Sequence, residues 1–504
     1  MAMKLKEGSL DYPLNELRQH LYRAADMIVD LYDTMESDKV LQSRSPSEVR
    51  PIFDEPLPES PTDLTTLLKR IEREVFFHAN RNIGPNFYGY VQSGGNHAGL
   101  VGDLLAMALN QNPGKWHLGP AATEIELRVI RWVAEFIGFP EETGGVLVSG
   151  GSAANLTCLK AARDFQAPFA LQMQGAKAGS QLTMYVSTEG HSCLDKSADM
   201  LGIGREYLRK IPVGSDFRID VEKLEQKILE DKANGFLPVC IIGNGGTVNT
   251  GTVDPLNDLA ALAKRHHLWF HIDGAYGGPA AATSLAGAMF SGLEKADSVA
   301  TDGHKWLYVP YEVGVALVRN KKALNASFRI IPDYLKSDPS LSDRHNATEY
   351  HFELSRNFKA LKMWMTFLAY GAPALRAAIE SNIQTMWFLA KLIDTSEDFE
   401  RMAPVPLSIV CFRYKTTDPQ FSNDEEYLNR LNQKILTDVE KDGRVFLSGT
   451  ILNGKQVLRA CSVNHRTDLP HVQFLLNVLR EIVANAHATL TPALSLPGEG
   501  RGGF

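Results

Sequence analysis

The sequence predicts an α/β protein with a mostly parallel sheet, because short apolar runs alternate with helical segments between about residues 96 and 372. The runs richest in β-branched and aromatic residues are expected strands at 182–187, 239–242 and 268–272. Helical patterns follow them at about 191–202, 221–233 and 255–266. Ligands of such sheets bind beyond the carboxyl ends of the strands. The polar residues at these ends are Ser187, Asn244, Asp273 and Asp302.

The two ends of the chain are expected to form smaller parts. Apolar residues at helical spacing from Leu14 to Leu31 predict a helix, and the Pro-rich stretch 46–61 should run extended. Because these segments enclose little core, residues 1–95 are predicted to form an arm that packs on the body or on a second subunit. Residues 373–489 predict a smaller α+β domain whose sheet is exposed on one face, with strands at 408–414 and 457–463 and helices at 424–440 and 469–487. The tail 490–504 is rich in Pro and Gly and should be disordered.

Composition narrows the class of protein. The chain has 504 residues, 44% of them hydrophobic, so it can bury a large core. A net charge of −7 gives no reason to expect nucleic acid or an anionic membrane as partner. The five cysteines form no CxxC pair and are expected to be reduced and mostly buried. No signal peptide is expected, and no apolar run approaches the roughly 20 residues of a spanning helix. We therefore expect a soluble, cytoplasmic protein.

The chemistry of the chain is indicated by Lys305, which follows His304 just beyond an apolar strand, with Asp273 upstream at the end of another strand. Pyridoxal phosphate enzymes need a lysine that forms a Schiff base with the cofactor aldehyde. They also need an acid that keeps the pyridine nitrogen protonated, so that the ring can accept the electrons of a carbanion. Alone, Lys305 could be a surface lysine and Asp273 a turn residue.

Three further segments favour the same chemistry, although each has a plainer interpretation. Residues 149–155, SGGSAAN, precede a helical run, so their backbone could cradle a phosphate or form an ordinary capped turn. His191 follows the strand 182–187 and could stack on a flat pyridine ring or cap a helix. Thr247 follows Gly245 and Gly246 at the end of strand 239–242, where its hydroxyl could reach the ring or simply close a turn.

Taken in order, these motifs resemble the group II pyridoxal-phosphate decarboxylases of the aspartate-aminotransferase fold type, most of all the aromatic-L-amino-acid decarboxylase branch. The resemblance spans roughly residues 10–485 and also includes segments 86–90, 119–124 and 356–364. It implies a seven-stranded sheet in the large domain, pyridoxal 5'-phosphate as cofactor and an amino acid as substrate. It further implies a homodimer clasped by the N-terminal arm, and no metal is expected.

The resemblance also implies roles for single residues. Lys305 would link to the cofactor, Asp273 would pair with the ring nitrogen, and His191 and Ala275 would lie against opposite faces of the ring. The expected phosphate ligands are Gly151, Ser152 and His304. Thr247 matches less well, because relatives often carry a second threonine where this chain has Val248.

The segment 330–336 resembles the mobile catalytic loop of the family. The polar, helix-poor stretch 333–347 is expected to be a lid that orders on substrate binding, with a passive surface loop as the alternative. Its Tyr334 would protonate the substrate carbon after carbon dioxide leaves. Relatives that yield an aldehyde tend to have phenylalanine at this place, so Tyr334, together with His191, favours simple decarboxylation.

The substrate is expected to be an aromatic L-amino acid of the tyrosine, DOPA, phenylalanine or tryptophan type. Its expected contacts are Tyr90, Ser93, Asn112, Gly114 and Ser355. Gly114 stands where aromatic-specific relatives have phenylalanine, and Asn112 replaces an aliphatic residue, so we expect a wider and more polar pocket. Ser355 resembles the phenol-preferring plant relatives. An acidic, basic or aliphatic substrate stays open, as do an aldehyde synthase, a carbon–carbon lyase and a non-catalytic protein.

Overall fold

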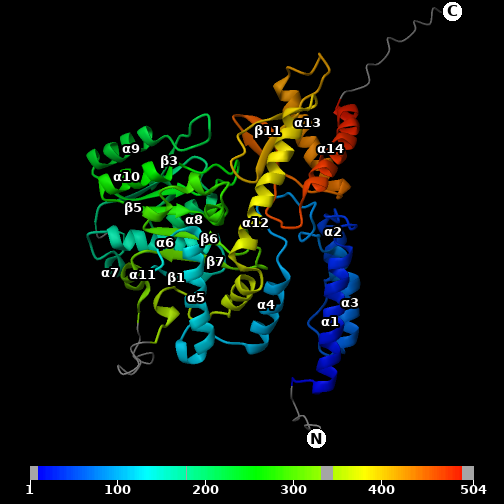
Figure 1. Ribbon diagram of the computed structural model, residues 1–504, viewed down its shortest axis with the longest axis horizontal. Coiled ribbons are helices and arrows are strands. Elements are labelled where there is room, and N and C mark those ends of the chain that lie inside the picture. The colour runs from blue at the N-terminus through cyan, green and yellow to red at the C-terminus, as the bar shows by residue number, and fades with distance from the viewer. Residues whose placement is uncertain (1–9, 177–178, 331–343, 491–504) are drawn as a thin grey trace, which may run out of the picture.

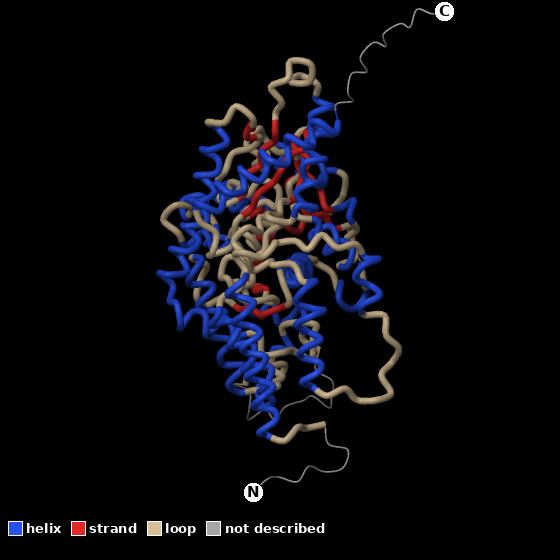
Figure 2. The backbone as a smooth tube through the Cα atoms, turned by 90° about the vertical axis from the view of Figure 1, so that its right-hand side faces the viewer, coloured by secondary structure: helices blue, strands red, loops and turns tan. Residues whose placement is uncertain are grey.

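The computed structural model describes residues 10–176, 179–330 and 344–490. Within these ranges it contains two sheets, both surrounded by helices and loops (Figure 2). The larger sheet has seven strands in the order β1-β7-β6-β5-β4-β2-β3, namely β1 Gly144–Val148, β2 Leu182–Ser187, β3 Leu208–Ile211, β4 Leu237–Asn244, β5 Trp269–Asp273, β6 Ser298–Asp302 and β7 Gly314–Val318. Strands β3, β2, β4, β5 and β6 pair in parallel, whereas β7 runs antiparallel to β6 and β1. The predicted mostly parallel sheet is confirmed.

Helices cover both faces of this sheet (Figure 1). They are α5 Pro120–Ile137, α6 Gly151–Gln166, α7 Leu171–Gln174, α8 Ser192–Met200, α9 Val221–Ala233, α10 Leu256–His266 and α11 Lys321–Phe328. Side chains of a strand alternate between the two layers. In β2, Met184 and Val186 pack with residues of α6, α8 and α11, whereas Tyr185 between them packs with residues of α5, α9 and α10. Because both faces are buried, the strands read as continuous apolar runs.

Local capping explains why the predicted helix α9 begins where it does. Asp220 precedes α9, and its carboxylate accepts a hydrogen bond from the backbone N–H of Lys223 at 3.0 Å. The prediction that the stretch 46–61 runs extended is wrong at its start, where α2 spans Pro46–Val49. There the hydroxyl of Ser45 accepts from the Glu48 N–H while the Glu48 carboxylate accepts from the Ser45 N–H, which favours a helical turn over extended chain.

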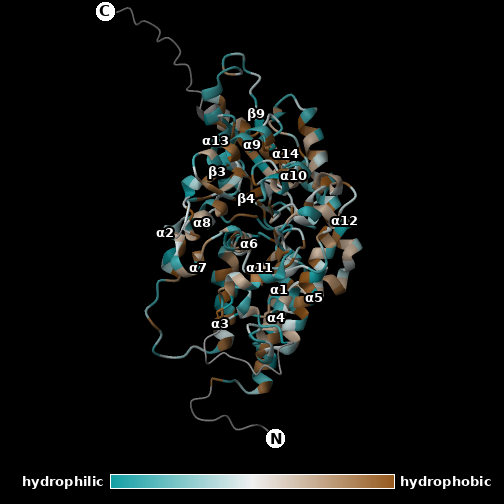
Figure 3. Cartoon of the chain, turned by 90° about the vertical axis from the view of Figure 1, so that its left-hand side faces the viewer, coloured by the Kyte–Doolittle hydropathy of each residue, from teal (hydrophilic) through white to brown (hydrophobic). Residues whose placement is uncertain are grey.

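The N-terminal helices bury little of their own surface. Helix α1, Leu14–Thr34, and helix α3, Leu64–Arg70, lie side by side at the edge of the molecule, away from the large sheet (Figure 1). Only Met27 of α1 is buried, while Leu14 is 77% and Val29 is 65% exposed. Hydrophobic and hydrophilic residues are interspersed along this part of the chain (Figure 3). Helix α4, His97–Leu109, also exposes apolar side chains, among them Leu104 and Met107.

A long helix, α12 at Ala360–Asp394, leads from the large sheet to the small one. It is interrupted at Gly371, where φ is 73° and ψ is 158°, a conformation that glycine adopts more readily than other residues. Pro373, two residues later, lacks the N–H that a continuous helix would use. The chain therefore changes direction beside the predicted domain boundary at 372/373.

The small sheet is antiparallel in the order β10-β11-β9-β8, with β8 Phe399–Arg401, β9 Ile409–Tyr414, β10 Ser448–Leu452 and β11 Lys455–Cys461. Helices α13, Glu425–Asp442, and α14, Leu469–Leu490, accompany it. The prediction that one face is exposed is wrong for β9: Val410 and Phe412 pack in the core of the small domain, while Ile409 and Cys411 pack in the core that includes the large sheet. Docking between domains buried the second face, which strand alternation alone does not reveal.

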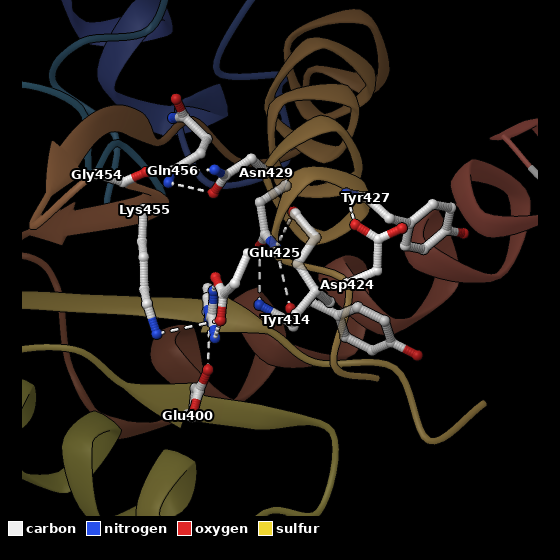
Figure 4. A network of polar contacts seen from close by, with 12 residues as sticks. Glu400, Tyr414, Asp424, Glu425, Tyr427, Asn429, Gly454, Lys455 and Gln456 are labelled. Carbon is white, nitrogen blue, oxygen red and sulfur yellow. Dashed lines mark hydrogen bonds and ion pairs between the residues drawn. The ribbon is translucent and has the colours of Figure 1, made fainter. Parts of the chain in front are cut away.

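The outer end of β9 is held by charges. Arg413 forms ion pairs with Glu400 of β8 and Glu425 of α13, and Lys455 of β11 also pairs with Glu425 (Figure 4). Nearby, the side chain of Asn432 accepts from the N–H of Tyr414 and donates to its carbonyl. These contacts join three strands and a helix at one end of the small domain.

Candidate active site

The carboxyl ends of the large-sheet strands surround a cavity of about 550 Å³. The turn after β1 contributes residues 149–153, the start of α8 contributes His191 and Cys193, and β4 leads into residues 246–249. Strands β5 and β6 end at the same cavity with Asp273 and Asp302. The small domain closes one side with Ser448, Gly449 and Arg459. The cavity therefore lies where the strand pattern placed a ligand site.

Helix α6 points its first turn at this cavity. Its N-cap residue, Gly150, provides no side-chain cap, so the first backbone N–H groups of the helix are free to bind an anion. A Cβ atom at Gly151 would lie 2.8 Å from the Cβ of Ala275 and 2.9 Å from Oδ2 of Asp302. Glycine is thus required at this position by close packing, and Ser152 beside it lines the cavity. This segment has the features of a phosphate cradle.

Lys305 lines the cavity and pairs with a buried carboxylate. Its Nζ lies 3.0 Å from Oδ2 of Asp302, and its side chain is 20% exposed. Burial opposes the positive charge of the amine, but Asp302 and Asp273 outweigh this effect, so the pKa of Lys305 lies above its usual value. Asp273 is buried and accepts a hydrogen bond from the Ala275 N–H at 3.2 Å.

His191 both caps a helix and lines the cavity. As N-cap of α8, it accepts a hydrogen bond at Nδ1 from the backbone N–H of Cys193 at 3.2 Å. Burial lowers the pKa of the imidazole, which favours the neutral ring. A neutral ring that accepts at Nδ1 carries its proton on Nε2. Helix capping and ring stacking were the two interpretations of His191. The cap therefore fixes the tautomer in which the imidazole would stack on the ring.

The hydroxyl of Thr247 is engaged within its own turn. It accepts from the Thr252 N–H at 3.1 Å and lies 3.1 Å from Oγ1 of Thr250. Thr247 still lines the cavity, together with Val248. His304 also lines it, and burial lowers the pKa of this imidazole. Ser93 lies behind His304 and donates its hydroxyl to the His304 carbonyl at 2.9 Å, so it supports the wall of the cavity instead of lining it.

Two groups at the cavity escaped sequence reasoning. His271, two residues before Asp273 on the same strand, lies 2.7 Å from Oδ1 of Asn155 through Nε2 and 2.8 Å from Oγ of Ser298 through Nδ1. Burial lowers the pKa of His271 to about 4, so the ring is neutral. The His-x-Asp spacing was a usable signal, because alternate strand residues share a face. These hydrogen bonds tie β5 and β6 to α6 beneath the cavity.

Arg459 is the second such group. From β11 it donates to the carbonyl of Val248 at 2.8 Å and to that of Tyr90 at 3.0 Å. It is 3% exposed and lines the cavity. An arginine in an alternating strand 154 residues after Lys305 carries no local signal, and only the docking of the two domains brings it here.

The residues expected to contact the substrate are divided between two places. Tyr90 lines the cavity with Lys305, whereas Asn112 and Ser355 line a separate cavity of about 490 Å³ between α4 and the start of α12. A Cβ atom at Gly114 would lie 2.5 Å from the carbonyl oxygen of Leu354. The backbone of Leu354 thus occupies the space beside Gly114, and the wider, more polar substrate pocket stays a prediction. Tyr334 lies outside the described residues.

Comparison with known proteins agrees with this geometry. The family model for the pyridoxal-dependent decarboxylase conserved domain matches residues 46–415. The chain belongs to this family. It is accordingly a pyridoxal-phosphate-dependent amino acid decarboxylase.

Individual relatives match over almost their whole length. An aromatic-L-amino-acid decarboxylase of Bacillus atrophaeus is 36% identical over 95% of this chain and 97% of its own. Tyrosine decarboxylase 4 of Petroselinum crispum is 32% identical, over 95% and 96%. Among solved structures, Oryza sativa TDC with PLP and tryptamine has a TM-score of 0.89 at 27% identity, covering 96% of this chain and 99% of its own. No helix among the described residues is long and apolar enough to cross a membrane.

The cavity fits pyridoxal phosphate in three respects. The uncapped start of α6, with its required glycine, suits the phosphate. Lys305 supplies an amine, and Asp273 at the end of the neighbouring strand supplies a carboxylate for the ring nitrogen. The two neutral imidazoles, His191 and His304, add no charge of their own to these groups.

Proposed function

We propose that the chain decarboxylates an aromatic L-amino acid of the tyrosine, DOPA, phenylalanine or tryptophan type, giving the amine and carbon dioxide. The observation that carries this proposal is that Lys305, Asp273 and His191 line one cavity at adjoining strand ends. The relatives named above, which are decarboxylases of aromatic amino acids by name, supply the substrate class.

The residues of the chain divide the work as follows. The free N–H groups of α6 bind the phosphate, with Ser152 and His304 beside them, and Lys305 holds the cofactor through its amine. When bound, pyridoxal phosphate supplies an electron sink for the bond that loses carbon dioxide. Asp273 keeps a proton at the ring nitrogen, because a buried carboxylate stabilises a positive charge next to it. His191 and Ala275, which line the same cavity, would hold the ring.

Two residues are proposed to present protons at the substrate site. His191 presents its Nε2–H to the cavity, since Nδ1 is used by the Cys193 N–H. Tyr334 delivers a proton to the substrate carbon after carbon dioxide leaves, which gives an amine. With phenylalanine in its place, the carbon would lack this donor.

We also propose that the active protein is a homodimer located in the cytoplasm. Helices α1 and α4 expose apolar side chains, and contiguous exposed apolar surface is a mark of protein interfaces. The five free cysteines among the described residues are all buried, which suits a reducing compartment. Deleting residues 1–80 should give aggregated or inactive protein, as judged by size-exclusion chromatography and amine release. A fully active monomer would contradict the arm's proposed role.

The substrate is tested by incubating the purified protein with pyridoxal phosphate and each of the twenty amino acids plus DOPA. Mass spectrometry of the products should find tyramine, dopamine, phenethylamine or tryptamine. An amine from an acidic, basic or aliphatic amino acid in their place would overturn the substrate class but not the reaction. An aldehyde with oxygen uptake would instead favour an aldehyde synthase.

A further inference from the structure

Asp302 is a charged group at the cavity for which the reaction described above has no use. It is the last residue of β6 and is 1% exposed. Its Oδ2 lies 3.0 Å from Nζ of Lys305 and 3.7 Å from Nε2 of His304. Its Oδ1 has no hydrogen-bond partner within the described part of the chain. Since burial lowers the pKa of His304, Lys305 is the cation that balances this carboxylate.

Other groups around Lys305 contribute less to its charge. Asp273 on β5 acts on it electrostatically but makes no hydrogen bond to it. His191 at the start of α8 is favoured in its neutral form by burial, which lowers its pKa. Three further groups face Lys305 and are kept neutral because burial raises their pKa: the Tyr311 phenol, the Cys193 thiol and, on β11, the Cys461 thiol. Asp302 is therefore the group that holds the amine in a direct ion pair.

We propose that Asp302 is a positioning residue that holds Lys305 as an ammonium and so controls how readily this amine captures the cofactor aldehyde. An ammonium has no lone pair, so Lys305 must first give up a proton. Its nitrogen then attacks the carbonyl carbon, a carbon–nitrogen double bond forms, and the aldehyde oxygen leaves as water. The carboxylate slows the first step but holds the amine in a fixed position at the cavity. This inference rests on the role proposed for Lys305.

Asp302→Asn tests the inference, because asparagine keeps the size and a hydrogen-bonding oxygen while removing the charge. The cofactor-free full-length chain is mixed with pyridoxal phosphate at pH 7, and capture is followed by absorbance. A carboxylate at this distance shifts a pKa by about one unit or more, so capture should be roughly tenfold faster in the variant. Asp195→Asn is the matched control. It removes a surface pair with Lys210 at 2.9 Å, and capture should match that of the wild type.

Removing the charge of Asp302 would also weaken its repulsion of the cofactor phosphate. Two measurements separate this effect from the effect on Lys305. Pyridoxal, which has no phosphate, should be captured faster by the variant in the same proportion. Competitive labelling of amines with acetic anhydride, read by mass spectrometry at Lys305 between pH 7 and 11, should show a lower midpoint in the variant. Faster capture of pyridoxal phosphate alone, or an unchanged labelling midpoint, would overturn the inference.

Lys305→Ala separates the inference from the proposed function. If that variant still forms a covalent link with the cofactor, the role of Lys305 is wrong. If it forms none while Asp302→Asn behaves like the wild type, only the inference about Asp302 fails. Thermal melting and circular dichroism establish that each variant is folded, and the labelling experiment needs neither cofactor nor turnover.

Discussion

At the carboxyl edge of the large sheet, Lys305, Asp273 and His191 line one cavity, whereas Asn112 and Ser355 line another next to the exposed α4. The first region is built from strand ends that a single sheet brings together. The second is built from the end of α4 and from loop residues, and Met107, an α4 residue that lines it, is 75% exposed. The difference teaches that one chain brings the residues expected to bind the cofactor into a single cavity, but does not bring all the residues expected to contact the substrate to the same place.

The largest effect on turnover is expected from a substitution of Lys305, in the first cavity. Lys305→Ala should lower turnover by at least about a thousandfold, because no nearby amine replaces this nucleophile. Borohydride reduction followed by mass spectrometry should find no cofactor attached to the protein. Lys210→Ala, on the surface, should behave like the wild type. Normal turnover in Lys305→Ala would place the reactive lysine elsewhere.

Asp273→Asn should slow decarboxylation by about 10² to 10³-fold at saturating cofactor, the usual cost of removing one group that stabilises developing charge. Cofactor binding itself should survive, because the phosphate cradle on α6 is untouched. The measurement is kcat alongside a cofactor titration. A near-normal kcat at full cofactor occupancy would contradict the pairing of Asp273 with the ring nitrogen.

Tyr334→Phe probes the substrate half by changing the product more than the rate. The variant should still release carbon dioxide, but much of the amine should be replaced by aldehyde, ammonia and peroxide, since the proton donor is lost and dioxygen can compete. Oxygen consumption and amine yield are measured together under air. Unchanged amine yield without oxygen uptake would make His191 the leading proton donor.

Gly114→Ala tests how tightly the backbone packs around Gly114, beside the second cavity. The added Cβ would meet the Leu354 carbonyl at 2.5 Å, so we expect a loss of about 1–3 kcal/mol in the free energy of unfolding. Urea denaturation measures it, with Ser355→Ala as a nearby control that adds no atom. Unaltered stability in Gly114→Ala would show that this segment shifts freely and could widen for a substrate.

The smallest effect is expected far from both cavities, at Glu425. The ion pairs with Arg413 and Lys455 lower the pKa of Glu425 to about 2. A lowered pKa in the folded state stabilises the fold above the unfolded value of about 4.3, and this contribution is lost as the pH falls toward 2. Because the side chain is 51% exposed, Glu425→Gln should cost no more than about 1 kcal/mol at pH 7. Denaturation of both proteins at pH 7 and pH 3 should show the difference shrink at low pH.

The strand ends were predictable because their signals are local. Strand β2 and helix α9 span the predicted residues, and Ser187, Asn244, Asp273 and Asp302 each close a strand as expected. Errors arose where a second surface decides burial, as for Ile409 and Cys411 on β9, or where a capping pair competes with extended chain, as at Ser45. Domain limits and the assigned roles of the site residues stay predictions until they are tested by mutation.

The sequence by itself determined the parallel sheet, the family and the set of residues at the carboxyl edge, because apolar periodicity and turn residues act over a few positions at a time. Only the tertiary structure decided that Arg459 joins the cavity and that the Leu354 backbone fills the space beside Gly114. These contacts depend on how separate segments dock. Docking depends on which whole faces become buried and on how buried charges are paired. No short stretch of sequence encodes these properties.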